Sequence, residues 1–194
     1  MKIAFGFKAH SGWAALVVVG LNNGSIEILD RRRIELAEEE WAKQPYHAAE
    51  ELKPSEARKV VQRGVRDAHK CALREMQAAV KRYGVDDQYV TACGVLVGND
   101  MPDWTVEEIL AVHFRMHKAE GVLFREALAE AAASCGLRVA RVPEKNLLDY
   151  GQQVFKKSQD RLVKEIATIG KEAGPPWGKD QKDAALAAMI ALSE

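Results

Sequence analysis

The sequence predicts an α/β fold in which a mixed five-stranded sheet is covered by helices on both faces. Three strand patterns joined by short turns open the chain, which is typical of an antiparallel meander. Two further strand patterns each follow a long helical pattern, and right-handed crossovers make them parallel to the first strand. A closing apolar helix completes the order βββ-α-β-α-β-(α)-α.

The first three strands are expected at residues 2–8, 13–19 and 25–36. The second pattern is β-branched and continuously apolar, which indicates burial on both faces. Asn23-Gly24 marks the hairpin turn before the third strand, since its residues tolerate positive φ. These features predict the opening meander.

A long irregular connection, residues 37–55, follows the meander, and long loops in compact domains are often functional. Ser55 is the expected cap of a long amphipathic helix that ends at Gly84. One face of this helix is apolar. Its stripe is Val61, Val65, Ala68, Ala72, Met76 and Val80.

The second half alternates strands and helices. Residues 88–97 and 137–142 are the fourth and fifth strands. Thr105 and Glu108 match a capping box, so a helix is expected from Thr105 through Ser134. Mixed signals from Leu147 precede a helix over residues 158–170, a Gly-Pro-Pro breaker and the last helix, which is entered at Trp177. Trp177 is expected to pack at that entry, or alternatively to stack on a base.

The composition indicates one domain, residues 1–194, in a reducing compartment. Lys plus Arg and Asp plus Glu each number 28, so no overall field attracts nucleic acid or a membrane surface. Arg31-Arg32-Arg33 is the densest basic run, and a solvated strand end is the favoured interpretation.

The chain has three cysteines, which lie far apart in the sequence, so we expect free thiols rather than disulfides. No apolar run has membrane-spanning length, so we expect a cytoplasmic protein that does not bind a membrane. The three thiols are Cys71, Cys93 and Cys135.

Two short stretches carry a resemblance to a known family. The opening Ile3-Ala4-Phe5-Gly6-Phe7-Lys8-Ala9-His10-Ser11-Gly12-Trp13-Ala14 is similar to the Gly-hydrophobic-Asp-x-Gly strand and turn of RuvC-type resolvases. Asp180-x-x-Asp183, before an Ala-rich helix, is similar to their closing acidic helix. The chain therefore resembles the ribonuclease H-like superfamily, which implies a nuclease that binds nucleic acid and holds Mg²⁺ or Mn²⁺ on carboxylates.

The acidic set that the resemblance implies is incomplete. The first-strand aspartate of the family falls on Lys8, and the acidic residue expected on the fourth strand falls near Cys93 and Gly94. Asp180 and Asp183 remain. Because two-metal cleavage needs several carboxylates, an ammonium at position 8 argues against the inherited mechanism.

Ligands in sheets of this kind lie beyond the carboxyl ends of the parallel strands. We therefore expect one cleft that gathers polar side chains from five separate stretches of the chain. Its expected members are Lys8, His10, Ser11, His47, Asn99, Glu144, Asp180, Lys182 and Asp183.

Each proton-carrying or charged candidate has a structural alternative. Asp180 can simply stabilise a helix start, and Lys8 can form a structural ion pair with Asp183. His10 and Ser11 can form a plain turn or, with Lys8, a phosphate cradle. His47 can act as a general acid or base or as a metal ligand, whereas an exposed loop histidine is the commoner case.

A second group of polar residues shares one helical face: His113, His117 and Glu120. The two histidines have the i, i+4 spacing of metal ligands, but the glutamate of a His-Glu-x-x-His motif is absent. A packed or half-buried polar stripe is the favoured interpretation.

Three functions remain open. The first is a domain that binds a phosphate-bearing ligand, with nucleic acid as the favoured ligand, or acts as a homodimer module, with degenerate or absent nuclease activity. The second is an active nuclease in which Asp180, Asp183 and Glu144 hold Mg²⁺ or Mn²⁺. The third is an enzyme of other chemistry built on Lys8, His10 and His47.

Overall fold

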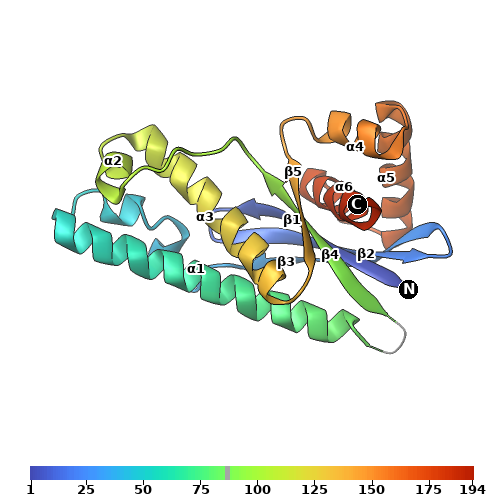
Figure 1. The fold of residues 1–194 in the computed structure, drawn as a ribbon, viewed down its shortest axis with the longest axis horizontal. Helices are drawn as coiled ribbons and strands as arrows, with labels where there is room; N and C mark the ends of the chain where they lie inside the picture. The colour runs from blue at the N-terminus through green and yellow to red at the C-terminus, as the bar shows by residue number, and fades with distance from the viewer. Residues whose placement is uncertain (86–87) are drawn as a thin grey trace.

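The computed structural model describes residues 1–85 and 88–194, and these form a mixed five-stranded sheet with helices on both faces (Figure 1). The strand order is β3-β2-β1-β4-β5. β1 to β3 are antiparallel, while β4 and β5 run parallel to β1. The predicted fold class is confirmed. The strands are β1 Lys2–His10, β2 Trp13–Asn22, β3 Ser25–Glu35, β4 Tyr89–Val97 and β5 Arg138–Pro143.

The helices divide between the two faces. On one face α1 and α3 run side by side with α2 at one end, and on the other α6 lies against the sheet with α4 and α5 beside it (Figure 1). The helices are α1 Pro54–Tyr83, α2 Val106–Leu110, α3 His113–Ser134, α4 Leu147–Phe155, α5 Gln159–Ala173 and α6 Lys179–Ser193, with 3-10 turns η1 Trp41–Lys43 and η2 His47–Ala49. No helix among the described residues is both long and apolar enough to cross a bilayer.

The strand pattern explains the two-sided packing. Phe5, Leu16 and Val18 belong to the hydrophobic cluster under α1 and α3. Val17 and Val19, the alternate positions of β2, belong to the cluster under α6. Successive strand side chains point to opposite faces, so a continuously apolar strand is buried on both, as predicted.

Two helices differ from the predictions, one at its start and one by a break in its course. Lys53, not Ser55, is the N-cap of α1, and its ammonium has no acceptor, so no side chain caps the helix start. Pro54 occupies the first helical position, where its missing N–H costs no hydrogen bond. The helix predicted from Thr105 to Ser134 is two helices. The Thr105–Glu108 capping box is present, but Val112 has extended backbone (φ −142°, ψ 113°), and Arg115 donates to the Glu108 carbonyl that the break leaves free.

Helix α6 lies unusually close to the sheet because glycines face it. A Cβ on Gly6 would lie 1.8 Å from the Ala184 carbonyl oxygen, and one on Gly94 would lie 2.2 Å from that of Ala187. Gly6 and Gly94 are register partners on the parallel strands β1 and β4. The helix backbone therefore rests directly on the centre of the sheet, which sets the position of its first turn.

Two further sequence interpretations are settled by contacts. Trp177 packs against Gly170 and donates its indole N–H to the Ile166 carbonyl at 3.1 Å, so the packing interpretation is confirmed. The solvated interpretation of the arginine run is wrong for Arg31, which donates to the carbonyls of Ala173, Pro175 and Pro176 and ties β3 to the entry of α6.

Candidate functional site

The candidate site lies where β1 ends beneath the first turn of α6. The Lys8 ammonium donates to the Asp183 carboxylate at 2.7 Å and lies 3.4 Å from Asp180 and 3.3 Å from Glu144. Glu144 follows β5, whose parallel pairing with β4 brings its carboxyl end to the same rim as that of β1. The seating of α6 on Gly6 and Gly94 holds its aspartates over this rim. One lysine is therefore surrounded by three carboxylates from distant parts of the chain.

The Lys8 side chain is almost fully buried, with the whole residue 7% exposed. Burial alone would lower the pKa of Lys8, but the hydrogen bond to Asp183 and the negative charges of Asp183 and Glu144 outweigh it and raise the pKa above its ordinary value. Lys8 is therefore a fixed cation at neutral pH.

Two further cations stabilise the rim. Lys179 donates to Asp183 at 2.5 Å, and Arg125 of α3 donates to Glu144 at 2.9 Å. The first pair has i, i+4 spacing within α6, a signal that the sequence contains. Arg125 has no such signal, because its partner comes from another element.

His10 connects this cluster to an aromatic stack. Its Nε2 lies 3.0 Å from the Asp180 carboxylate, and its ring stacks on Trp13 with centroids 4.2 Å apart. The Arg33 guanidinium lies 4.2 Å from the Trp13 ring centroid. His10 and Trp13 are opposite each other in the β1–β2 hairpin, so their contact follows from register.

Among the residues that the structure describes, the remaining predicted members of the cleft form no hydrogen bond or ion pair with Lys8. Ser11 is exposed in the β1–β2 turn. Asn99 borders a surface hollow of about 380 Å³ beside Arg125, and Lys182 borders another beside Trp177. Direct contacts therefore bring together five of the nine predicted residues: Lys8, His10, Glu144, Asp180 and Asp183.

His47 belongs to a different group. Its side chain is 19% exposed, bonds to Glu120 and lies against His113 and His117, so the exposed-loop interpretation is wrong. Within residues 1–85 and 88–194, no hydrogen bond or ion pair joins this group to Lys8. The packed-stripe interpretation holds only for Glu120, which is 1% exposed, whereas His113 and His117 are exposed.

Solved structures share this architecture. Thermus thermophilus RuvC in complex with Holliday junction substrate matches over 100% of this chain and 94% of that chain, with a TM-score of 0.54 and 13% identity. The chain has a RuvC-like, ribonuclease H-like fold. A second T. thermophilus RuvC structure matches over 98% of this chain and 93% of its own, with a TM-score of 0.53 and 13% identity. No protein-family model and no curated protein sequence matches the chain.

The residues present do not fit the divalent metals that a RuvC-like fold implies. The Lys8 ammonium lies in hydrogen-bond or ion-pair contact with each of the three carboxylates that would otherwise hold a cation. On β4 the expected acidic position falls at Cys93 and Gly94, and burial raises the pKa of the Cys93 thiol. A cation bound between Asp180 and Asp183 would meet the positive charge of Lys8 within a few ångströms.

Proposed function

We propose that this chain binds nucleic acid through a RuvC-like fold and does not cleave phosphodiester bonds by the two-metal mechanism. The observation that argues against two-metal cleavage is the position of the Lys8 ammonium, which lies among Asp180, Asp183 and Glu144. It neutralises part of their charge and occupies the space that a metal ion would need.

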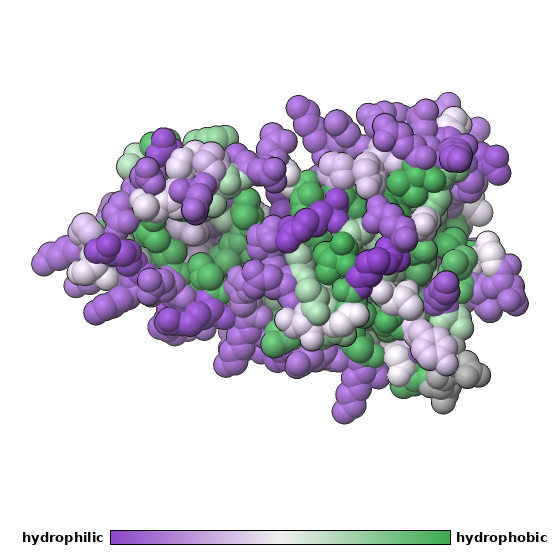
Figure 2. All heavy atoms as spheres, in the orientation of Figure 1, coloured by the Kyte–Doolittle hydropathy of each residue, from purple (hydrophilic) through white to green (hydrophobic). Residues whose placement is uncertain are grey.

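A basic stripe on α1 supports the proposal that the chain binds nucleic acid. Four exposed cations, spaced 7, 4 and 11 residues apart, lie on one helical face. They are Lys59, Arg66, Lys70 and Lys81. Hydrophilic side chains project along α1 in Figure 2. Within the described ranges no ion pair engages these four cations. At about 1.5 Å per residue, a helix of 30 residues spans about 45 Å, long enough to follow a phosphate backbone.

The fold points to the same class of ligand. The RuvC structure that matches the full chain is in complex with a Holliday junction substrate. A branched DNA is therefore the first probe to test. A homodimer and a cytoplasmic location stay predictions, and analytical ultracentrifugation of the purified chain tests the first.

Fluorescence anisotropy with a labelled four-way junction, a duplex and a single strand tests binding. Affinity should fall steeply as salt rises, since neutralised phosphates release counter-ions. Arg66→Glu/Lys70→Glu should weaken binding by about tenfold or more at about 0.1 M salt. The matched control is Lys164→Glu/Lys171→Glu, which reverses two exposed charges of α5. Salt-independent binding, or equal effects of the two double variants, would contradict the proposal.

Incubation of the wild-type chain with the same DNAs and Mg²⁺ or Mn²⁺ tests cleavage. We expect no cleavage above that of the Asp180→Asn/Asp183→Asn variant, because Lys8 already pairs with both carboxylates. Metal-dependent cleavage by the wild type that this variant abolishes would instead establish the Mg²⁺ nuclease.

A further inference from the structure

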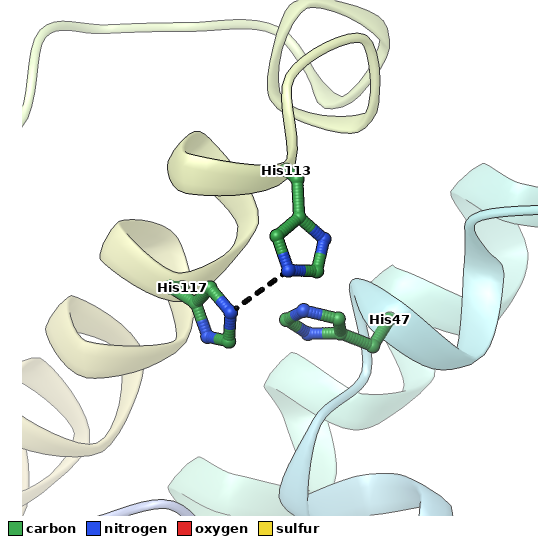
Figure 3. Close-up of side chains that lie close together, drawn as sticks. All are labelled: His47, His113 and His117. Atoms are coloured by element: carbon green, nitrogen blue, oxygen red, sulfur yellow. Dashed lines mark hydrogen bonds between the residues drawn. The ribbon is translucent and has the colours of Figure 1, made fainter.

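Three histidines from two distant segments converge beside the long connection that precedes α1. His47 begins the 3-10 turn η2, and His113 and His117 lie one turn apart at the start of α3 (Figure 3). One ligand nitrogen from each lies within 4.8 Å of the others. The Nε2 atoms of His113 and His117 are 3.1 Å apart. The three rings point toward a common centre.

Glu120 orients the His47 ring. Both Glu120 carboxylate oxygens lie 2.9 Å from His47 Nδ1, and one of them accepts the backbone N–H groups of Tyr46 and His47 at 3.2 Å. An ionised carboxylate only accepts hydrogen bonds, so Nδ1 carries the hydrogen. In the neutral ring, Nε2 is then the atom with the free lone pair.

His47 Nε2 is buried and has no hydrogen-bond partner within the described part of the chain. Buried polar atoms in folded proteins are nearly always paired, with protein, water or an ion. This atom is on the side of the ring that faces His113 and His117 (Figure 3), whereas Glu120 contacts the other ring nitrogen, Nδ1. An unpaired nitrogen held by a carboxylate on its other side is the arrangement that a metal-binding histidine has.

We propose that His47, His113 and His117 bind one divalent transition metal of the Zn²⁺ class, with His47 ligating through Nε2. Imidazole nitrogens suit Zn²⁺, Cu²⁺ and Ni²⁺, whereas Mg²⁺ and Ca²⁺ prefer oxygen. Zn–N bonds of about 2.0–2.1 Å in a tetrahedron put ligand nitrogens about 3.3 Å apart, close to the His113–His117 separation. Three protein ligands leave a fourth position, on the exposed side of His113 and His117, for water.

The bound metal would join the long connection to α3. Tyr46 and Ala49 of the connection already pack with Ile109 and Met116 in a small hydrophobic cluster apart from the sheet. The carboxylate–histidine–metal arrangement would add a bond between segments that are far apart in the sequence.

Metal titration of the untagged, chelator-treated protein tests the site. Competition with a chromophoric chelator should show one Zn²⁺ per chain, and Co²⁺ should give the intense visible absorption of a tetrahedral site. His117→Asn should weaken Zn²⁺ binding by more than about 100-fold, since loss of a ligand exceeds the 10–100-fold effect of an outer partner. His69→Asn is the matched control, because His69 pairs with Glu130 outside the cluster and should leave affinity unchanged.

Glu120→Gln tests the positioning role. It should weaken Zn²⁺ binding by about 10–100-fold, whereas Glu130→Gln should not. His117 is exposed, so an unchanged apo melting curve for His117→Asn separates loss of the metal from loss of the fold. Substoichiometric binding, Co²⁺ with the weak absorption of an octahedral ion, or wild-type affinity in both His113→Asn and His117→Asn would overturn the proposal.

Discussion

The Lys8 ammonium lies within 3.4 Å of three carboxylates, two from α6 and one from the segment after β5. Each of these carboxylates is partly exposed, while Lys8 is buried. Water therefore screens the repulsion among the carboxylates only in part, and the lysine supplies the rest of the compensation. The same contact connects the sheet to α6.

Lys8→Met tests the structural contribution of this cation. It leaves Asp180, Asp183 and Glu144 without their shared partner, so we expect the free energy of unfolding at neutral pH to fall by about 3 kcal/mol. Urea denaturation measures the change. Lys2→Met, at an exposed site on the same strand, should change it by less than about 0.5 kcal/mol. Similar losses from the two variants would show that the pairing of Lys8 with the three carboxylates contributes nothing to the free energy of unfolding.

The difference between wild type and Lys8→Met should depend on pH at the alkaline end. Folding raises the pKa of Lys8, so the native state holds its proton more tightly than the unfolded state. The stabilisation is fully present below the ordinary lysine pKa of 10.5 and is lost as pH rises from there through the higher pKa of the folded state. Denaturation at about pH 8 and about pH 11 should therefore show a smaller difference at the higher pH. An equal or larger difference at the higher pH would contradict the pairing.

The sequence predicted the Lys8 cluster but not the histidine cluster, for a physical reason. Parallel strands end at one rim, so a lysine ending β1 and aspartates starting α6 could be placed together from their order alone. His47 lies in an irregular connection whose path has no periodic signal. Its position is set by a buried glutamate 73 residues away that accepts two backbone N–H groups.

At the scale of elements, the close packing of α6 on the sheet determines where Asp180 and Asp183 lie. Gly6 and Gly94 let the helix backbone approach, and Ala184, Ala187 and Ala188 present only small side chains to the strands. A larger side chain at either glycine must push the helix away. The aspartates at the start of the helix would move with it.

Gly94→Ala is expected to lower the free energy of unfolding by about 3 kcal/mol, because its Cβ would meet backbone that cannot rotate away. Thermal denaturation measures the loss. Gly121→Ala is the matched control: it lies within α3 with no atom near the added Cβ, and should stabilise by about 0.5–1 kcal/mol. A stable Gly94→Ala variant would mean that α6 is free to shift.

The element order was predictable, but some boundaries were not. The alternation of strands and helices and the Thr105–Glu108 capping box are local signals, and both are confirmed. The break at Val112 is not marked by glycine or proline. It depends on tertiary contacts, among them the packing of Ile109 and Met116 against the loop and α1.

At the scale of the whole molecule, the apolar packing of residues 1–85 and 88–194 falls into two large clusters and one small one. The large clusters lie on opposite faces of the sheet, and the small one joins the long connection to α2 and the ends of α1 and α3 (Figure 1). Segments with little buried apolar surface open at lower free energy than the core. The region of the small cluster is therefore expected to open before the sheet does.

Hydrogen exchange followed by mass spectrometry tests this order. Amides of η2 and α2 should exchange faster than those of β1 and β4, whose backbone groups pair on both sides. Addition of Zn²⁺ should slow exchange in η2 and at the start of α3 and leave the central strands unchanged. His117→Asn should remove this effect. Uniform protection by Zn²⁺, or none, would contradict a local metal site.

The Lys8 contact has a further consequence for how the molecule responds to its surroundings. A cation that is part of the chain cannot be diluted, chelated or exchanged for another ion, so its occupancy does not follow mass action. The carboxylate cluster should therefore keep the same geometry in EDTA and in millimolar Mg²⁺.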